Sequence, residues 1–187
     1  INLGTVSNSS NVLTTHYNIP AFTTLSSKSW TITDGGVSTL IPMMLTITLP
    51  SASSVDVPLS SSTGLYIDWG DGTASTSLSR AYSSSGTYTL FIASTASGLQ
   101  YGNSSNTTFS PYVTSIVQWG NLAITNYSYA FKGSQITTVP SGFPTNVTNM
   151  KGMFQNCTSL NASISFTTTS VTDMSYMFQG CTLFNQS

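Results

Sequence analysis

The feature that most constrains the fold is a repeat in the last third of the chain. Ile124 recurs as Val147 and as Val171, in steps of 23 and 24 residues, and a fixed period of this length is typical of a solenoid. The same register aligns Tyr127 with Met150 and Met174, Ala130 with Met153 and Met177, and Phe131 with Phe154 and Phe178. Within a unit these apolar residues fall at i, i+3, i+6 and i+7, the spacing of one side of a short helix. Because so small a unit cannot bury its apolar face alone, we expect each unit to be covered by the next.

Upstream of the repeat, apolar residues alternate with serine and threonine over short stretches. Leu45, Ile47 and Leu49 alternate with threonines, and similar patterns recur over residues 55–59 and 88–92. Alternation of this kind is typical of half-buried strands. We therefore expect residues 35–100 to form an antiparallel β-sandwich. Its edges are open to pairing between subunits, since the chain has few lysines to block them.

A tight turn interrupts this pattern at residues 69–73, with the sequence WGDGT. Leu65 and Ile67 lead into the turn on one face of a strand. Asp71 followed by Gly predicts a two-residue hairpin of type I′, because both residues tolerate positive φ. Asp68 and Asp71 fit turn chemistry, in which the carboxylates accept bonds from nearby backbone N–H groups. They are also the chain's candidates for a calcium site, although calcium usually needs more oxygen ligands than two aspartates supply.

Two segments resemble known families. Residues 65–93 resemble a PKD-type domain, an immunoglobulin-like β-sandwich whose signature is a WGDGT-like turn, a tyrosine and a G-T-Y strand. The matching residues are Trp69, Gly70, Asp71, Gly72 and Thr73, then Tyr82, and then Gly86, Thr87 and Tyr88. Ala81 departs from the family, which often has histidine there. Residues 147–158 and 171–182 resemble the BspA-type leucine-rich repeats of microbial surface proteins, and residues 114–121 resemble the segment that precedes such repeats.

Together these resemblances predict a mainly β chain in four parts. We predict an N-terminal β-forming extension over residues 1–34, a PKD-like sandwich over 35–100, a linker and solenoid entry over 101–123, and BspA-type repeats over 124–187, the last one incomplete. The fold class is an immunoglobulin-like antiparallel sandwich followed by a short leucine-rich-repeat-type solenoid with short helical turns. The resemblance implies a secreted or cell-surface protein with adhesion or assembly roles and no shared catalytic site.

Composition excludes several function classes. Charged residues make up 5% of the chain, far below the usual share, and no basic stripe for nucleic acid is present. Serine and threonine account for 64 of the 187 residues, so solubility comes from hydroxyls, amides or attached glycan. The longest apolar run, residues 40–49, is too short to span a bilayer. His16 is the only histidine and has no metal-spaced or triad-like partners, so we expect no enzyme activity, no catalytic residue, no metal site and no cofactor.

Cys157 and Cys181 lie one repeat apart. Equivalent positions on adjacent rungs would lie near the spacing of neighbouring strands, which is inside the Cα range for a disulfide. Stacked free thiols are the alternative for a repeat position, and the sequence does not decide between the two.

Eight Asn-x-Ser/Thr motifs are candidates for N-glycosylation. They begin at Asn8, Asn103, Asn106, Asn126, Asn146, Asn156, Asn161 and Asn185. In a source without that pathway they are ordinary polar residues, and both interpretations stand.

The functional hypothesis favoured by these features is a structural subunit of a surface layer or filament, with another copy of the chain as its partner. Residues 1–34 either pair with their own sandwich or act as a donor strand for a neighbouring subunit. The chain stops at Ser187, partway through a repeat and without a polar cap, so we expect that either the natural chain continues or another subunit covers the end. The alternative is a monomeric adhesin or carbohydrate-binding module for a glycan, host or cell-surface ligand, with Tyr101, Phe109 and Tyr112 as exposed contacts.

Overall fold

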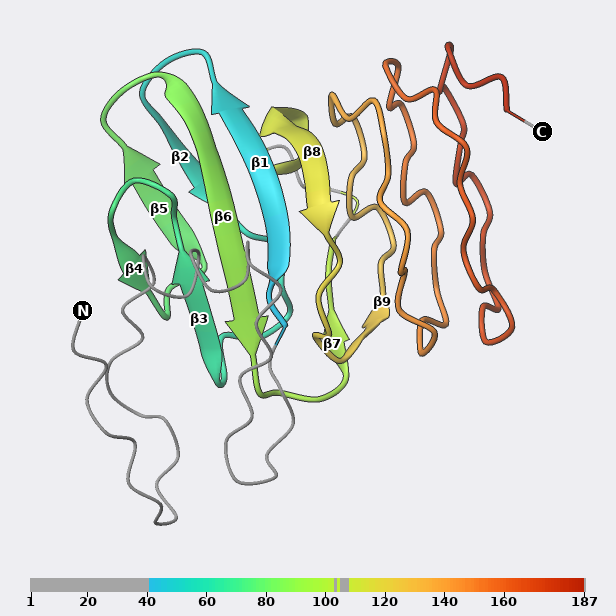
Figure 1. The fold of residues 1–187 in the computed structure, drawn as a ribbon, viewed down its shortest axis with the longest axis horizontal. Coiled ribbons are helices and arrows are strands. Elements are labelled where there is room, and N and C mark those ends of the chain that lie inside the picture. Colours follow the sequence, from blue (N-terminus) through green and yellow to red (C-terminus); the bar gives the residue numbers. More distant parts are fainter. Residues whose placement is uncertain (1–40, 103, 105–107, 187) are drawn as a thin grey trace. The chain divides into compact units, whose positions relative to one another are not determined.

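The computed structural model describes residues 41–102, 104 and 108–186 (Figure 1). Contacts group Leu40–Ser187 into one compact unit, distinct from Ile1–Thr39. The predicted extension over residues 1–34 and its candidate role as a donor strand lie outside the described residues, as does His16. The internal division at residues 101–123 stays a prediction.

Two β-layers form the first half of this unit, and the mainly β fold class is confirmed. One layer is a five-stranded antiparallel sheet in the order β4-β3-β6-β1-β8, and the other contains the antiparallel pair β2-β5. The strands are β1 (Met43–Leu49), β2 (Ser53–Asp56), β3 (Leu65–Asp68), β4 (Ala74–Ser75), β5 (Ser79–Tyr82), β6 (Gly86–Ser94) and β8 (Val113–Gln118). A 3-10 helix, η1 (Ser110–Tyr112), precedes β8.

The alternation in the sequence builds the core between the layers. Leu45, Ile47 and Leu90 are fully buried, whereas Thr46 and Thr89, which pair across β1 and β6, point to the other face of the sheet. Ile67 and Trp69 are likewise fully buried, as the sequence predicts for one face of β3. Burial of these side chains is the main force that holds the layers together.

The core continues from the sandwich into the solenoid without a break. A bridge between Leu59 and Tyr101 extends the second layer to β7 (Leu99–Gln100), which pairs in parallel with β9 (Ile124–Asn126). Parallel bridges then join Asn126 to Asn149 and Asn149 to Asp173. These bridges confirm the predicted register of the repeat. We call residues 124–134, 147–157 and 171–181 the first, second and third rungs; in Figure 1 they stack in the orange to red part of the chain.

Hydrogen bonds between rungs replace the short helix that the spacing indicated. The N–H groups of Tyr127 and Phe131 donate to the carbonyls of Asn149 and Met153 on the next rung, at 2.8 and 2.9 Å. No α-helix is assigned in the described residues. The physical reason is that each rung contains residues with positive φ: Tyr129, Gly133, Gly152, Asn156, Tyr176 and Gly180. A left-handed residue ends a right-handed helical turn, so each rung becomes a series of short turns.

Aromatic rings stack along the solenoid core. Phe131, Phe154 and Phe178 form a column with ring centroids 5.9 Å apart at each step and planes within 16° of parallel. Phe143 and Phe166 stack in a second column at 4.1 Å. In the described part of the chain, no helix has the length and apolar character needed to cross a membrane.

Candidate functional site

The turn between β3 and β4 uses both of its carboxylates internally. Asp68 Oδ1 accepts a hydrogen bond from Gly70 N at 2.9 Å, and Asp71 Oδ1 accepts bonds from Thr73 N and Oγ1 at 3.0 and 2.6 Å. Asp71 Oδ2 accepts bonds from Arg80 Nη2 and Nε at 2.6 and 2.9 Å. Residues 41–102, 104 and 108–186 contain no group of three His, Cys, Asp or Glu that could hold a metal ion. The arrangement is that of turn chemistry and a bridge to β5.

The hairpin at this turn has a different geometry from the type I′ turn that the sequence indicated. Positive φ occurs at Gly70 (72°) and Gly72 (85°), but Asp71 is not among the residues with positive φ. Trp69 N donates to Thr73 O at 3.0 Å, which closes a wider loop than a two-residue turn. The loop has this shape because the Asp71 carboxylate is tied to Thr73, which places the two glycines at the left-handed positions.

Tyrosines anchor the same turn to the core. Tyr82 Oη donates to Trp69 O at 2.7 Å, and the Tyr82 ring lies 4.3 Å from that of Tyr88 between centroids. Burial raises the pKa of Tyr82 well above its ordinary value. Burial also raises the pKa of Asp68, and the bond from Gly70 offsets this only in part. Burial acts in the same direction on Asp71, but hydrogen bonds from Thr73 and Arg80 outweigh it and hold the pKa of Asp71 below its ordinary value. The WGDGT signature therefore has a structural role, which is to hold the turn between β3 and β4 against β5 and the core.

The cysteines are buried free thiols rather than a disulfide. Cys157 Sγ donates to Phe131 O at 3.0 Å and Cys181 Sγ donates to Phe154 O at 2.9 Å. Each thiol thus points at a carbonyl of the preceding rung instead of at the other sulfur. Burial raises the pKa of Cys157 to about 11 and also raises the pKa of Cys181.

The glycosylation candidates differ in exposure. Asn8, Asn103 and Asn106 lie outside the described residues; Asn126 is half-buried, and Asn146, Asn156, Asn161 and Asn185 are exposed. The Asn126 side chain is engaged, since its Oδ1 accepts a bond from Ser128 N at 2.8 Å. Asn161 Oδ1 accepts bonds from Asn185 N and Gln186 Nε2. Glycosylation stays a prediction, and exposure without a side-chain bond favours Asn146, Asn156 and Asn185.

The aromatic residues that the sequence suggested as ligand contacts are largely core residues. Tyr101 and Phe109 are fully buried and Tyr112 is half-buried. Tyr101 packs against Phe109 and Tyr127, with ring centroids at 6.5 and 6.0 Å. The expectation of exposed contacts was wrong for Tyr101 and Phe109, because the start of the solenoid closes over them.

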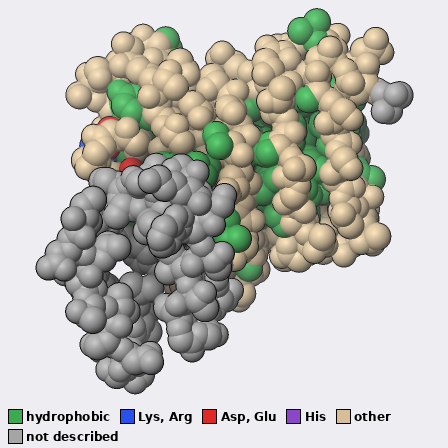
Figure 2. Space-filling model, in the orientation of Figure 1, with side chains coloured by type: hydrophobic (Ala, Val, Ile, Leu, Met, Phe, Trp, Pro, Cys, Tyr) green, Lys and Arg blue, Asp and Glu red, His purple; other side chains and the backbone are tan. Residues whose placement is uncertain are grey.

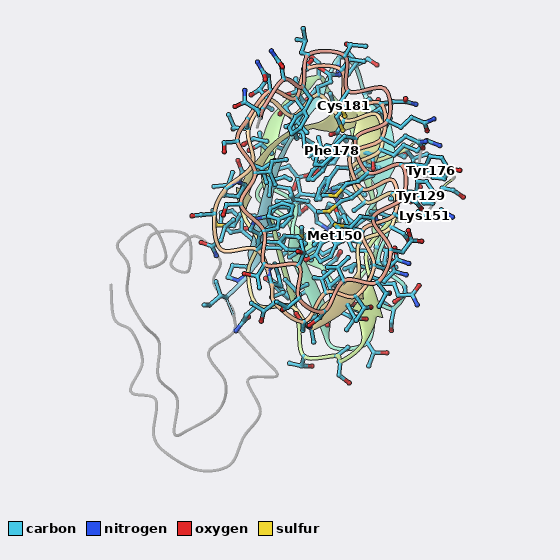
Figure 3. All side chains as sticks on the ribbon, turned by 90° about the vertical axis from the view of Figure 1, so that its right-hand side faces the viewer. Tyr129, Met150, Lys151, Tyr176, Phe178 and Cys181 are labelled. Atoms are coloured by element: carbon cyan, nitrogen blue, oxygen red, sulfur yellow. The ribbon has the colours of Figure 1, made fainter. Side chains whose placement is uncertain are left out.

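Aromatic and cationic side chains instead gather on one outer face of the rungs, where Tyr176 is exposed and Tyr129, Lys132 and Lys151 are half-buried. Lys132 Nζ lies 5.6 Å from the ring centroid of Tyr129, and Lys151 Nζ lies 5.9 Å from that of Tyr176, which is 57% exposed. Figure 3 shows Tyr129, Lys151 and Tyr176 on the same side of the solenoid. We call Tyr129, Lys132, Lys151 and Tyr176 the turn face. The sequence analysis did not predict this face. The signal for it was that the first and third rungs have a tyrosine at the position where the middle rung has Gly152.

The third rung presents a second exposed surface, which we call the end face. Its backbone N–H groups at Met174, Tyr176, Phe178 and Gly180 occupy the positions that bond to the next rung elsewhere, and they have no acceptor among the described residues. Met174 is 48% and Leu183 60% exposed. A hollow of about 220 Å³ includes Met174 in its lining, with Ile164, Phe166, Thr168, Met177, Phe178, Phe184 and Gln186. Figure 3 looks onto this face.

These features define the class of the protein: a two-layer β-sandwich whose edge is continued by the rungs of a short solenoid. Residues 103–187 match a family described as "Mycoplasma protein of unknown function, DUF285". The matched segment contains β8, β9 and all three rungs. Comparison of the chain with curated proteins and with solved structures finds no match.

Proposed function

We propose that this chain is an extracellular structural protein, a subunit that assembles into a filament or surface layer by docking its end face on another copy. The resemblance of residues 65–93 to PKD-type domains and of the rungs to BspA-type repeats supports a place at the cell surface. The family match over residues 103–187 agrees with a repeat-containing segment.

The observation that carries the proposal is the chemistry of the end face. Between the first and second rungs, and again between the second and third, alternate N–H groups of one rung donate to carbonyls of the next. The third rung offers the same four donors beside exposed Met174 and Leu183. A row of unpaired donors next to apolar surface is a template for another β-forming segment.

A further repeat of the same protein or a second copy of the chain would fit this face, and we propose the second copy. The formal net charge is −1, so copies do not repel one another strongly. The surface seen in Figure 2 shows almost no charged side chains over the described residues. The β-forming pattern of residues 1–34 supplies a segment that could pair with the end face of a neighbour. A contact between two different ends of a molecule repeats without closing and builds a fibre.

The test is negative-stain electron microscopy and light scattering of the 187-residue chain over a concentration series. Met174→Lys places a charge on the end face, and we expect it to abolish fibres or sheets and leave monomers. Val117→Lys on β8 is the matched control, since Val117 is 46% exposed, close to the value for Met174. Assembly that survives Met174→Lys, or a wild-type chain that stays monomeric, would refute the proposal. Deletion of residues 1–34 then tests the donor strand separately, because assembly without them would exclude that role.

A further inference from the structure

The outer surface of the solenoid is chemically divided. The exposed residues within 137–146 and 161–170 are serine, threonine, asparagine and a single glycine. The turn face, on the rungs themselves, carries Tyr129, Lys132, Lys151 and Tyr176, and a side-chain bond joins Gln155 and Gln179 beside it. Rings, amides and cations together are unusual on so neutral a chain, and this division calls for a physical reason.

The backbone conformation at Tyr129 and Tyr176 gives one reason for this difference between the turn face and the rest of the outer surface. Tyr129 has φ 58° and Tyr176 has φ 59°, and the equivalent Gly152 has φ 56°. The left-handed region is unfavourable for a bulky side chain and costs nothing of that kind for glycine. The fold therefore accepts glycine at this position, as the second rung shows, yet places tyrosine there in the first and third rungs. Local strain of this kind is typical of binding sites.

The two lysines of the turn face have no salt-bridge partner among the described residues. The described residues contain a single salt bridge, between Arg80 and Asp71. Neither Lys132 nor Lys151 takes part in it. The pKa of Asp173 is lowered mainly by hydrogen bonds from Ser175, and the charge of Lys151 lowers it further. Each lysine lies over a tyrosine ring, which holds both groups in place by cation–π attraction.

The spacing of the rings defines the shape of the ligand. Tyr129 and Tyr176 lie two rungs apart, which is about 10 Å at the spacing of neighbouring strands. This separation is close to the length of one disaccharide in an extended β-1,4-linked glycan. Gly152, the equivalent residue of the middle rung, has no side chain of its own, and the Tyr129 ring packs over it: a Cβ there would lie 2.5 Å from Tyr129 Cε1. Lys151, on the same middle rung, stands where the sugar between the two rings would lie.

We propose that the turn face binds an extended acidic polysaccharide, with Tyr129 and Tyr176 stacking on alternate sugars and Lys151 pairing with a carboxylate of the sugar between them. This inference goes beyond self-assembly and uses a different surface from Met174 and Leu183. The larger hollow beside β2 and β7 is a weaker choice, because its lining, which includes Asp56, Ser79 and Gln100, contains no aromatic ring.

The test is titration calorimetry of the full chain with two matched probes, a β-1,4-mannuronate hexasaccharide and β-1,4-mannohexaose. They differ in the carboxylate, so we expect the acidic probe to bind about tenfold more tightly, the change that 1.4 kcal/mol produces. This preference should shrink as salt is raised, because screening weakens the lysine contacts. Equal binding of the two probes, or none at about 1 mM, would overturn the proposal.

Glycine substitutions separate a binding role from a structural one. Tyr129→Gly and Tyr176→Gly each fit the local backbone, and we expect each to weaken binding about tenfold. The thermal unfolding midpoint should stay unchanged for the exposed Tyr176→Gly, whereas Tyr129→Gly also removes the packing of a ring over Gly152. Tyr176→Asn, which also tolerates the left-handed region, is a second variant in case the glycine chain does not fold. Lys151→Met should abolish the preference for the acidic probe, and Tyr112→Leu, outside the turn face, should leave both affinities unchanged. Unchanged binding in both tyrosine variants, or a marked fall in the midpoint of Tyr176→Gly, would assign the rings a structural role instead.

Discussion

Gly70 and Gly72 allow the cost of close backbone packing to be measured apart from the cost of positive φ. Both have positive φ, 72° and 85°. A Cβ added at Gly70 would lie 2.6 Å from Thr89 O and 2.8 Å from Thr89 N, whereas one at Gly72 would meet nothing within 4 Å. Thr89 is in β6, an inner strand of the five-stranded sheet, so its backbone has little freedom to move.

The magnitudes follow from these contacts. Alanine in the left-handed region costs roughly 1–2 kcal/mol, and this applies to both positions. Overpacking against fixed atoms adds about 1–3 kcal/mol at Gly70 alone. We expect Gly70→Ala to lower the free energy of unfolding by about 2–5 kcal/mol in total, and Gly72→Ala by about 1–2 kcal/mol.

Urea unfolding followed by circular dichroism measures both changes. The two variants should share the m-value of the wild-type chain and differ in midpoint. Equal midpoints would refute the argument, because they would mean that β6 moves to accept the methyl group at no cost.

Two further predictions concern the solenoid core. Burial raises the pKa of Cys157 from 9.0 to about 11, so its thiol should resist alkylation at pH 8 until urea unfolds the chain. The contribution of this thiol to stability should be complete below pH 9 and should be lost as the pH rises through about 11. Urea unfolding at a series of pH values measures this loss. Fast labelling of folded protein at pH 8 would contradict this. Phe154→Ala should lower the free energy of unfolding by about 3–5 kcal/mol, more than Phe184→Ala in the same urea assay. The reason is that Phe154 is fully buried between two stacked rings, whereas Phe184 is half-buried. Similar losses of stability in the two variants would show that the column is not the packed centre of the rungs.

Local patterns were enough to predict strands β1, β3 and β6 and the register of the repeat. Alternation at residues 45–49 places one set of side chains on one face of a strand, whatever the rest of the chain does. Equivalent residues of a repeat must stack if each unit is to be covered, so the alignment of Phe131 with Phe154 and Phe178 follows from the period alone.

Features that depend on distant residues could not be predicted in this way. Tyr101 and Phe109 lie in a polar stretch of the sequence, where aromatic side chains suggest exposed contacts. They are buried only because the first rung packs on them. The turn face was missed for a related reason. Spacing suggested a helix, in which Tyr129 would be one surface residue among others. Tyr129 instead has φ 58°, and its N–H donates to Lys151 O on the next rung.

The ladder of bonds between rungs also determines how the chain would respond to a pulling force. Each interface carries a similar short row of N–H to carbonyl bonds, and each rung is linked to the next by one repeat length of chain. A load applied to the chain directly after the third rung would therefore act first on the bonds between the second and third rungs. Release of a 24-residue unit frees roughly 80 Å of extended chain. Because each ladder can separate independently, the solenoid can lengthen in steps of one repeat under load.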